Sequence, residues 1–382
     1  MKKIILIIFI LLTSGCWNYR ELNNSAIATA MSIDYSNNEY EVSLLFATGK
    51  TKEETKSEIT IQSAKGKTIY EAIKNISLST PKDIYISHLS LVIISSDIAK
   101  NGLNKVFDYL LREPQSHQNF DILIAKEDSA KNILSVINPL ADYPSQNIVS
   151  TIKITEQTQA RITNSSFNKF ISKILDKGIN PVSNSITLIG DNKVGSKKEQ
   201  QENSTTEAHT KLDTLGIFKE DKLITWANNE ESIGINMLLG DIDSLYLTIP
   251  CINNNDNNIV ITTSNYKIKN ITSKKKIDVV IKLDGTLNEV CCGIDLENKE
   301  VIEYIKKETI KKLKSYTYKA IRKARNYETD IFGYGNLIYK KYPRYYKKIN
   351  NWDKEFLKLD INVNIDFNLN NRGSTEYTIG GI

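Results

Sequence analysis

The sequence predicts a multi-domain α+β protein in which mixed β-sheets are flanked by helices. In the first half, short apolar strands alternate with amphipathic helices. In the second half, long strands dominate, and a long helical pattern comes before the last strand. Since 382 residues exceed the usual domain length of about 100–200, two or three domains are expected.

The predicted strands of the first half are short runs of apolar and β-branched residues bounded by turn residues. They lie at 26–34, 40–48, 89–95, 120–125 and 185–189. The predicted helices have apolar residues three or four apart, and they lie at 68–78, at 103–111, after Ser129 and at 165–175. Thr68 and Glu71 have the spacing of a capping box at the start of the first helix, and residues 51–58 are predicted as a charged loop.

Residues 191–212 are polar and almost lack apolar side chains. Such a segment buries too little apolar surface to offset its ordering entropy. It is predicted as a linker or exposed loop, and as the main domain boundary. The predicted division is a signal peptide at 1–15, an N-terminal α/β domain at 16–190, and a C-terminal α+β domain at 213–382, which the pattern also allows to be two subdomains.

The second half begins with a predicted hairpin at 214–219 and 222–226. The further predicted elements are helices at 230–239, 298–325 and 330–340, and strands at 245–249, 258–270, 276–290 and 359–369. The apolar stripe of the long helix includes Thr309 and two alanines, so this helix is expected to pack on a sheet rather than in a coiled coil. Gly285 is expected to mark a bulge.

The N-terminus has the pattern of a lipoprotein signal peptide. Lys2 and Lys3 precede an apolar run, 4–12, that is too short to span a bilayer but suits a signal peptide. Small residues then lead to Cys16, as in a bacterial lipobox, although Thr13 stands where Leu is usual. Cys16 is therefore the predicted lipid-attachment site, and two acyl chains there would hold the protein on a membrane. An uncleaved anchor and an ordinary secretion signal are the alternatives.

The charge is unevenly distributed. The formal net charge is +5, and it falls to +3 once Lys2 and Lys3 are removed with the signal peptide. Residues 299–348 carry a local charge of +10, which leaves about −7 on the rest of the mature chain. This basic segment is predicted either to face anionic headgroups or an acidic partner, or to be a solvated helix face.

The Tyr-rich basic stretch 339–346 has the composition of a nucleic-acid patch, because aromatic rings stack on bases and cations contact phosphates. The export signal argues against nucleic acid as a partner. A membrane-interface or partner-docking face suits tyrosine, lysine and arginine better.

No catalytic, cofactor or metal site is predicted. The Gly-Lys-Thr triplets at 49–51 and 66–68 lack the glycine that a phosphate-binding loop needs five positions earlier. His88, His117 and His209 have no second ligand at zinc spacing, and His88 is expected to begin a buried strand. The paired carboxylates Asp241 and Asp243 have no partner that the sequence identifies. The sequence therefore predicts that the protein is not an enzyme.

Three cysteines remain after Cys16. Cys251 lies at a predicted strand end, and the vicinal pair Cys291 and Cys292 follows another. The odd number leaves at least one thiol free or paired between chains. A link from Cys251 to Cys291 or Cys292 and a set of buried free thiols both remain open.

Several motifs, taken in order, resemble the Ger(x)C family, the lipoprotein C subunits of spore nutrient germinant receptors. The start Gly-Cys-Trp-Asn-Tyr-Arg-Glu-Leu at 15–22 is similar to the family's start, with Asn18 where Asp is usual. The other motifs are Ser87-His88-Leu89, the helix at 102–112, 216–219, 221–223, the Glu-Thr-Asp-Ile-Phe-Gly-Tyr-Gly segment at 328–335, Tyr342-Pro343 and Trp352. The likeness covers residues 15 to about 373.

The resemblance implies a lipid-anchored accessory subunit without known catalytic activity or cofactor. It implies a location on the inner membrane of the spore, facing outward, beside the integral-membrane A and B subunits. Together these subunits respond to nutrients and trigger germination. Only Cys16 has a role that transfers residue by residue. The alternative is a solute-binding lipoprotein of a transporter, which would show two similar α/β lobes.

Overall fold

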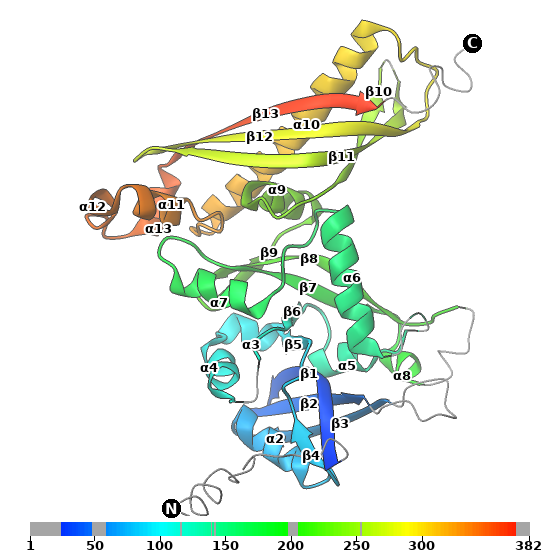
Figure 1. The fold of residues 1–382 in the computed structure, drawn as a ribbon, viewed down its shortest axis with the longest axis vertical. Coiled ribbons are helices and arrows are strands. Elements are labelled where there is room, and N and C mark those ends of the chain that lie inside the picture. The colour runs from blue at the N-terminus through cyan, green and yellow to red at the C-terminus, as the bar shows by residue number, and fades with distance from the viewer. Residues whose placement is uncertain are drawn as a thin grey trace, which may run out of the picture.

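The computed structural model describes residues 24–47, 59–114, 117–138, 140, 143–197, 205–252 and 254–371. These residues form two β-sheets with helices packed against them (Figure 1). The sheets lie one above the other along the long axis of the molecule, with the chain's early strands at one end and its last strand at the other. The predicted α+β, multi-domain class is confirmed.

The first sheet has nine strands in the order β3-β2-β1-β5-β6-β7-β8-β9, with β4 beside β1. Its centre, from β1 to β7, is parallel, and both of its flanks are antiparallel. The strands are β1 (Ser25–Ser36), β2 (Glu39–Ala47), β3 (Ile59–Gly66), β4 (Asp83–Tyr85), β5 (Leu91–Ser95), β6 (Asp121–Ala125), β7 (Val182–Ile189), β8 (His209–Lys219) and β9 (Lys222–Trp226).

Helices cover both faces of this sheet, and the central strand β5 shows why its sequence is apolar throughout. Val92 and Ile94 join the core on one face, whereas Leu91 and Ile93 join the core on the other, since side chains alternate along a strand. The helices are α2 (Ile69–Ser77), α3 (Ser96–Asn101), α4 (Asn104–Arg112), α5 (Ala130–Ser135), α6 (Pro144–Thr158), α7 (Phe167–Leu175) and the short α8 (Asn192–Gly195).

The second sheet has the order β10-β11-β12-β13 and is crossed on one face by the long helix α10 (Figure 1). Its strands are β10 (Tyr246–Cys251), β11 (Asn254–Thr272), β12 (Lys276–Val290) and β13 (Asp360–Asn371). The helices of this half are α9 (Asn229–Leu239), α10 (Lys299–Asn326), α11 (Tyr334–Lys341), α12 (Pro343–Tyr346) and α13 (Trp352–Leu357). The stripe of α10 is buried against the sheet, as predicted, and also against α9, where Gly234 lies beside Tyr316 and Ala320.

Gly285 lies where the register between β12 and β13 shifts, which agrees with the predicted bulge. A Cβ atom on Gly285 would lie 2.4 Å from the ring of Phe367, so the missing side chain also lets that ring pack on the strand.

The structure differs from several of the expectations drawn from the sequence. The strand β3 and the helix α6 were not predicted, and the helix predicted at 330–340 begins only at Tyr334. His88 is exposed and lies before the buried strand rather than at its start, with its ring 5.8 Å from that of Tyr85. Thr68 is the N-cap, as predicted, since its hydroxyl accepts from the Glu71 amide at 3.1 Å. The reciprocal bond of a capping box is replaced, because the Glu71 carboxylate accepts from the Lys67 amide at 2.8 Å instead of the Thr68 amide.

The polar segment at 191–212 connects two neighbouring strands of one sheet, because β8 pairs with β7. It carries α8 and the first residues of β8. The division into domains at 16–190 and 213–382 stays a prediction made from composition.

Candidate functional site

The most densely bonded polar centre of the described chain is the carboxyl group of Asp330, which is fully buried. Its two oxygens accept hydrogen bonds from four consecutive backbone amides and from one side chain. The donors are the amides of Phe332 at 3.1 Å, Gly333 at 3.0 Å, Tyr334 at 3.3 Å and Gly335 at 2.7 Å, and Nε1 of Trp352 at 3.0 Å.

These amides belong to the start of α11, where backbone N–H groups have no partner within the helix. Asp330 therefore satisfies the first turn of α11 from a position four residues before that helix. Gly333 has φ +75°, which brings the chain around the carboxyl group. Burial raises the pKa of Asp330 to about 6, against the opposing effect of the Gly335 amide and the Trp352 indole.

The same segment joins the second half of the chain to the first sheet. The backbone oxygen of Asp330 accepts from the Asn180 amide at 2.7 Å, and the Thr329 hydroxyl donates to the Phe218 carbonyl at 2.9 Å. Lys219 forms an ion pair with Asp353 at 2.8 Å. We call residues 328–335 and Trp352, together with the first-sheet residues they contact, the Asp330 joint.

Gly335 is the point of closest approach in this joint. A Cβ atom there would lie 2.5 Å from the indole of Trp352 and 2.7 Å from Cα of Gly178. Glycine at this position is therefore needed for the backbone to approach so closely. The sequence did not indicate that the Asp330 side chain is a buried hydrogen-bond acceptor, because the residues from 330 onward also have the pattern of a helix that begins there.

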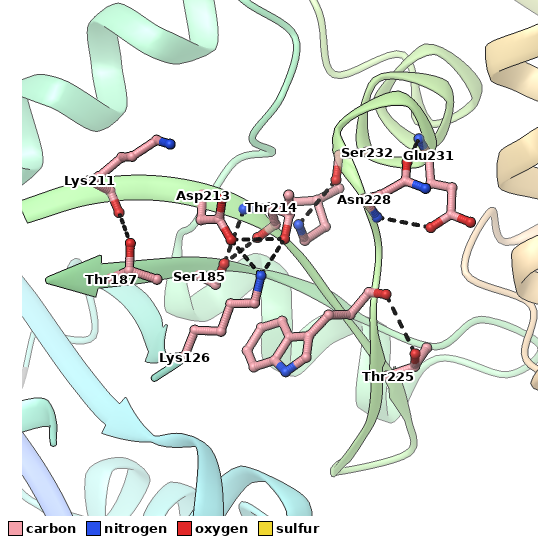
Figure 2. A network of polar contacts seen from close by, with 12 residues as sticks. Lys126, Ser185, Thr187, Lys211, Asp213, Thr214, Thr225, Asn228, Glu231 and Ser232 are labelled. Carbon is pink, nitrogen blue, oxygen red and sulfur yellow. Dashed lines mark hydrogen bonds and ion pairs between the residues drawn. The ribbon is translucent and has the colours of Figure 1, made fainter. Parts of the chain in front are cut away.

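A second polar network lies at the carboxyl end of β6 (Figure 2). The Lys126 ammonium contacts Asp213 and Thr214, and it lies 5.7 Å from the centre of the Trp226 ring. The Ser185 hydroxyl donates to the Thr214 carbonyl at 2.7 Å. These contacts tie β6, β7, β8 and β9 together, and the charges of Lys126 and Asp213 neutralise each other.

A third cluster of ionisable groups lies around α6, α7 and the turn after α9. Burial and the nearby carboxylates of Asp121, Asp241 and Asp243 raise the pKa of Glu156 to about 7. Asp241, for which the sequence offered no partner, accepts from the Thr163 hydroxyl at 3.0 Å and lies 3.6 Å from Nζ of Lys169. The carboxyl groups of this cluster outnumber the lysines that lie close enough to neutralise their charge.

Two adjoining hollows, of about 590 and 790 Å³, lie beside α2 and α4. They share Tyr70, Tyr109 and Glu113, and one of them reaches Asn24 at the start of the described chain. Burial raises the pKa of Tyr109, whose hydroxyl lies 3.4 Å from Glu113.

The remaining predicted site residues have separate positions. Cys16 lies outside the described residues. Cys251 and Cys292 form a disulfide, whereas Cys291 is an exposed free thiol. Within the described ranges, no group of three or more His, Cys, Asp or Glu side chains is arranged to hold a metal ion. No helix in that part of the chain combines the length and apolar character needed to cross a membrane.

These observations define a multi-domain α+β protein whose two sheets are joined through a buried polar centre. Residues 18–188 match the family described as Spore germination protein N-terminal domain, and residues 213–373 match Spore germination B3/ GerAC like, C-terminal. The chain belongs to this Ger(x)C family of spore germination proteins, as its motifs predicted.

Three proteins of Bacillus subtilis (strain 168) are similar to the chain. Spore germination protein KC is 25% identical, covering 95% of this chain and 93% of its own length. Putative spore germination protein YfkR is 30% identical, covering 63% of this chain and 62% of its own length. Spore germination protein B3 is 22% identical, covering 98% of each.

The crystal structure of the GerBC protein matches with a TM-score of 0.52 at 17% identity, covering 92% of this chain and 99% of that one. At this identity the match establishes a shared fold.

Proposed function

We propose that the protein is a lipid-anchored accessory subunit of a spore nutrient germinant receptor, attached through Cys16 to the inner membrane of the spore. The observation that carries the proposal is the match of both family domains, in order, along most of the chain. The relatives are named spore germination proteins, which supports a role in the same process. The partners we propose are the integral-membrane A and B receptor subunits.

The anchor gives this arrangement a physical basis. An extended chain of ~3.5 Å per residue from Cys16 to Asn24 reaches at most about 28 Å, so the first sheet would stay close to the bilayer. Restriction to the membrane plane raises the effective concentration of the protein beside its membrane partners. A subunit without a catalytic centre of its own can act in this way by holding or orienting its partners.

The alternative of a solute-binding lipoprotein is less well supported. Such a protein would have two similar lobes, whereas the two sheets here differ in strand number and in topology. The first sheet has a parallel centre, and the second combines antiparallel strands with one parallel pair.

The anchor is tested by replacing Cys16 with alanine in the native gene. We expect Cys16→Ala to abolish incorporation of labelled palmitate into the protein and to reduce nutrient-triggered germination to the level of a deletion strain. Cys291→Ala is the matched control, since Cys291 is exposed and unpaired with another cysteine, and it should leave both properties unchanged. Palmitate labelling of the Cys16→Ala protein equal to that of the unmodified protein would contradict attachment through this residue.

A further inference from the structure

The cations of the basic segment 299–348 fall into two groups. On α10, most of them have partners within the protein. Four lysines form ion pairs with glutamates: Lys306 with Glu303, Lys311 with Glu308, Lys319 with Glu230, and Lys323 with Glu231. Two more cations donate to backbone oxygens, Lys312 to that of Thr248 and Arg325 to that of Leu359. The charge of the long helix is thus largely used in holding its own half of the molecule together.

The second group forms what we call the basic tip, which consists of the β11–β12 turn, the end of α11, and α12 with the residues after it. Its cations are Lys274, Lys275, Lys340, Lys341, Arg344, Lys347 and Lys348. Among the residues that the structure describes, none of these cations has a carboxylate oxygen within ion-pair distance. Seven cations without a carboxylate partner are therefore close together at the tip. On α10, by contrast, the cations with neither an ion pair nor a bond to a backbone oxygen in the described part of the chain are four, spread along the helix: Lys299, Lys307, Lys314 and Arg322.

The tip is assembled from two lysine-rich segments that are distant in sequence. Nζ of Lys341 donates to the Thr272 carbonyl at 2.8 Å, and Nζ of Lys274 lies 5.8 Å from the centre of the Tyr345 ring. These contacts fix the β11–β12 turn against the end of α11 and against α12. The fold thus holds like charges together at one place, which is unfavourable unless an anion is nearby.

The surface of the tip is open and amphipathic. A shallow pocket of about 480 Å³ is lined by Lys274, Lys341, Arg344, Lys348, Tyr342 and Tyr345 among others, with no carboxylate in its lining. A neighbouring pocket of about 570 Å³ shares Lys341 and adds Lys269, Lys340 and the half-exposed side chain of Ile271. Cations, tyrosines and an exposed aliphatic side chain are the mixture that suits the headgroup region of a bilayer.

We propose that the basic tip binds the surface of an anionic phospholipid membrane, as a second membrane contact in addition to Cys16. The inference rests on the membrane location in the proposed function. The phosphate of the lipid headgroup is the group that the lysines and Arg344 contact, and the tyrosines and Ile271 lie at the level of the headgroups. One lipid anchor combined with a basic patch holds a protein on a bilayer more firmly than either one alone.

The second contact also sets the orientation of the molecule. In Figure 1 the tip, at α12, lies well away from β4 and α2, which mark the N-terminal end of the first sheet. Contact at both places lays the long axis of the protein along the bilayer instead of upright on it. A flank of the molecule, and not one end, then faces the lipid.

The test uses the chain from residue 17 onward, which contains every described element and carries no lipid. Its binding to vesicles of phosphatidylcholine with phosphatidylglycerol, and to phosphatidylcholine alone, is measured by flotation. The tip variant combines Lys274→Gln, Arg344→Gln, Lys347→Gln and Lys348→Gln, all at exposed positions. The control removes the same charge from α10 through Lys299→Gln, Lys307→Gln, Lys314→Gln and Arg322→Gln.

We expect the unmodified chain to bind only the anionic vesicles, and to bind them less strongly as salt is added. The tip variant should bind these vesicles at least about tenfold more weakly than the unmodified chain. The α10 variant should bind them as the unmodified chain does. Equal loss in both variants would overturn the proposal, because total charge and not the tip would then be responsible. Failure of the unmodified chain to bind the anionic vesicles would also overturn the proposal. The same holds if the unmodified chain binds an acidic protein but not the vesicles. Since the chain tested has no lipid, none of these outcomes depends on Cys16.

Discussion

At the scale of single residues, Asp330 shows how a carboxyl group is accommodated without any contact with solvent. A buried carboxylate lacking partners would cost several kcal/mol, but here four amides and an indole donate to it. The five donors need this acceptor just as much as the carboxyl group needs them. Loss of this one side chain would therefore leave five buried donors of the Asp330 joint without their acceptor.

Asp330→Ala should lower the free energy of unfolding by about 3–5 kcal/mol, because it leaves buried donors without an acceptor. Asp330→Asn keeps one side-chain oxygen and should cost less. Urea unfolding monitored by tryptophan fluorescence would measure both values. An Asp330→Ala protein as stable as the unmodified chain would show that the joint does not depend on this carboxyl group.

Glu156 gives a prediction about pH. Its pKa is raised from 4.5 to about 7, mainly by burial and then by Asp121, with Lys169 opposing and Asp241 and Asp243 adding to the rise. The folded state therefore holds the proton more tightly than the unfolded state does. This residue's contribution to stability falls as the pH rises from about 4.5 to about 7, and the penalty is complete above that range.

Glu156→Gln should consequently stabilise the protein above pH 7, by about 1 kcal/mol once solvent screening of this partly buried side chain is allowed for. The difference should vanish below pH 4.5, where the glutamate is protonated in both states. Melting temperatures of the two proteins between pH 4 and pH 8 would measure this. A constant difference across that range would contradict the assigned cause.

At the scale of secondary structure elements, the disulfide links the end of β10 to the residues just after β12. It closes a loop that contains β11 and β12. Replacing both Cys251 and Cys292 with alanine should lower the free energy of unfolding by about 2–4 kcal/mol. Cys291→Ala should have little effect. Thermal unfolding with and without reductant would measure this, and insensitivity of the unmodified chain to reductant would argue against the link.

Elements with a strong apolar period were predictable from the sequence. The stripe of α10 and the apolar run of β5 were both found, because a single pattern continued long enough to identify each. The strand β3 was missed, since it follows a charged stretch and its residues are mostly half-buried. The helix α6 was missed because its amphipathic pattern is weak and only a few of its residues are buried.

The joint was predictable only in part. Gly335 could be identified from its residue type, because glycine is needed where the backbone approaches closely. Asp330 could not, since its function depends on Trp352, Asn180 and the turn at Gly333, which the fold brings together. The pairing of Cys251 with Cys292 was equally a matter of tertiary geometry, because the sequence left either neighbouring cysteine open.

At the scale of the whole molecule, one core extends from the second sheet onto the edge of the first. Leu215 and Ile217 of β8 belong to the same apolar cluster as the residues buried under α10. Together with the Asp330 joint, this contact links the two halves through both apolar and polar groups. The two sheets are therefore held together by apolar packing and by hydrogen bonds.

That the protein is a subunit of a germinant receptor can be tested by purifying a tagged version from detergent-solubilised spore membranes and identifying the proteins that accompany it. We predict recovery of two integral-membrane germinant-receptor subunits, in amounts comparable to the tagged chain. Recovery of a transporter permease with its ATPase, or of no partner at all, would contradict the claim.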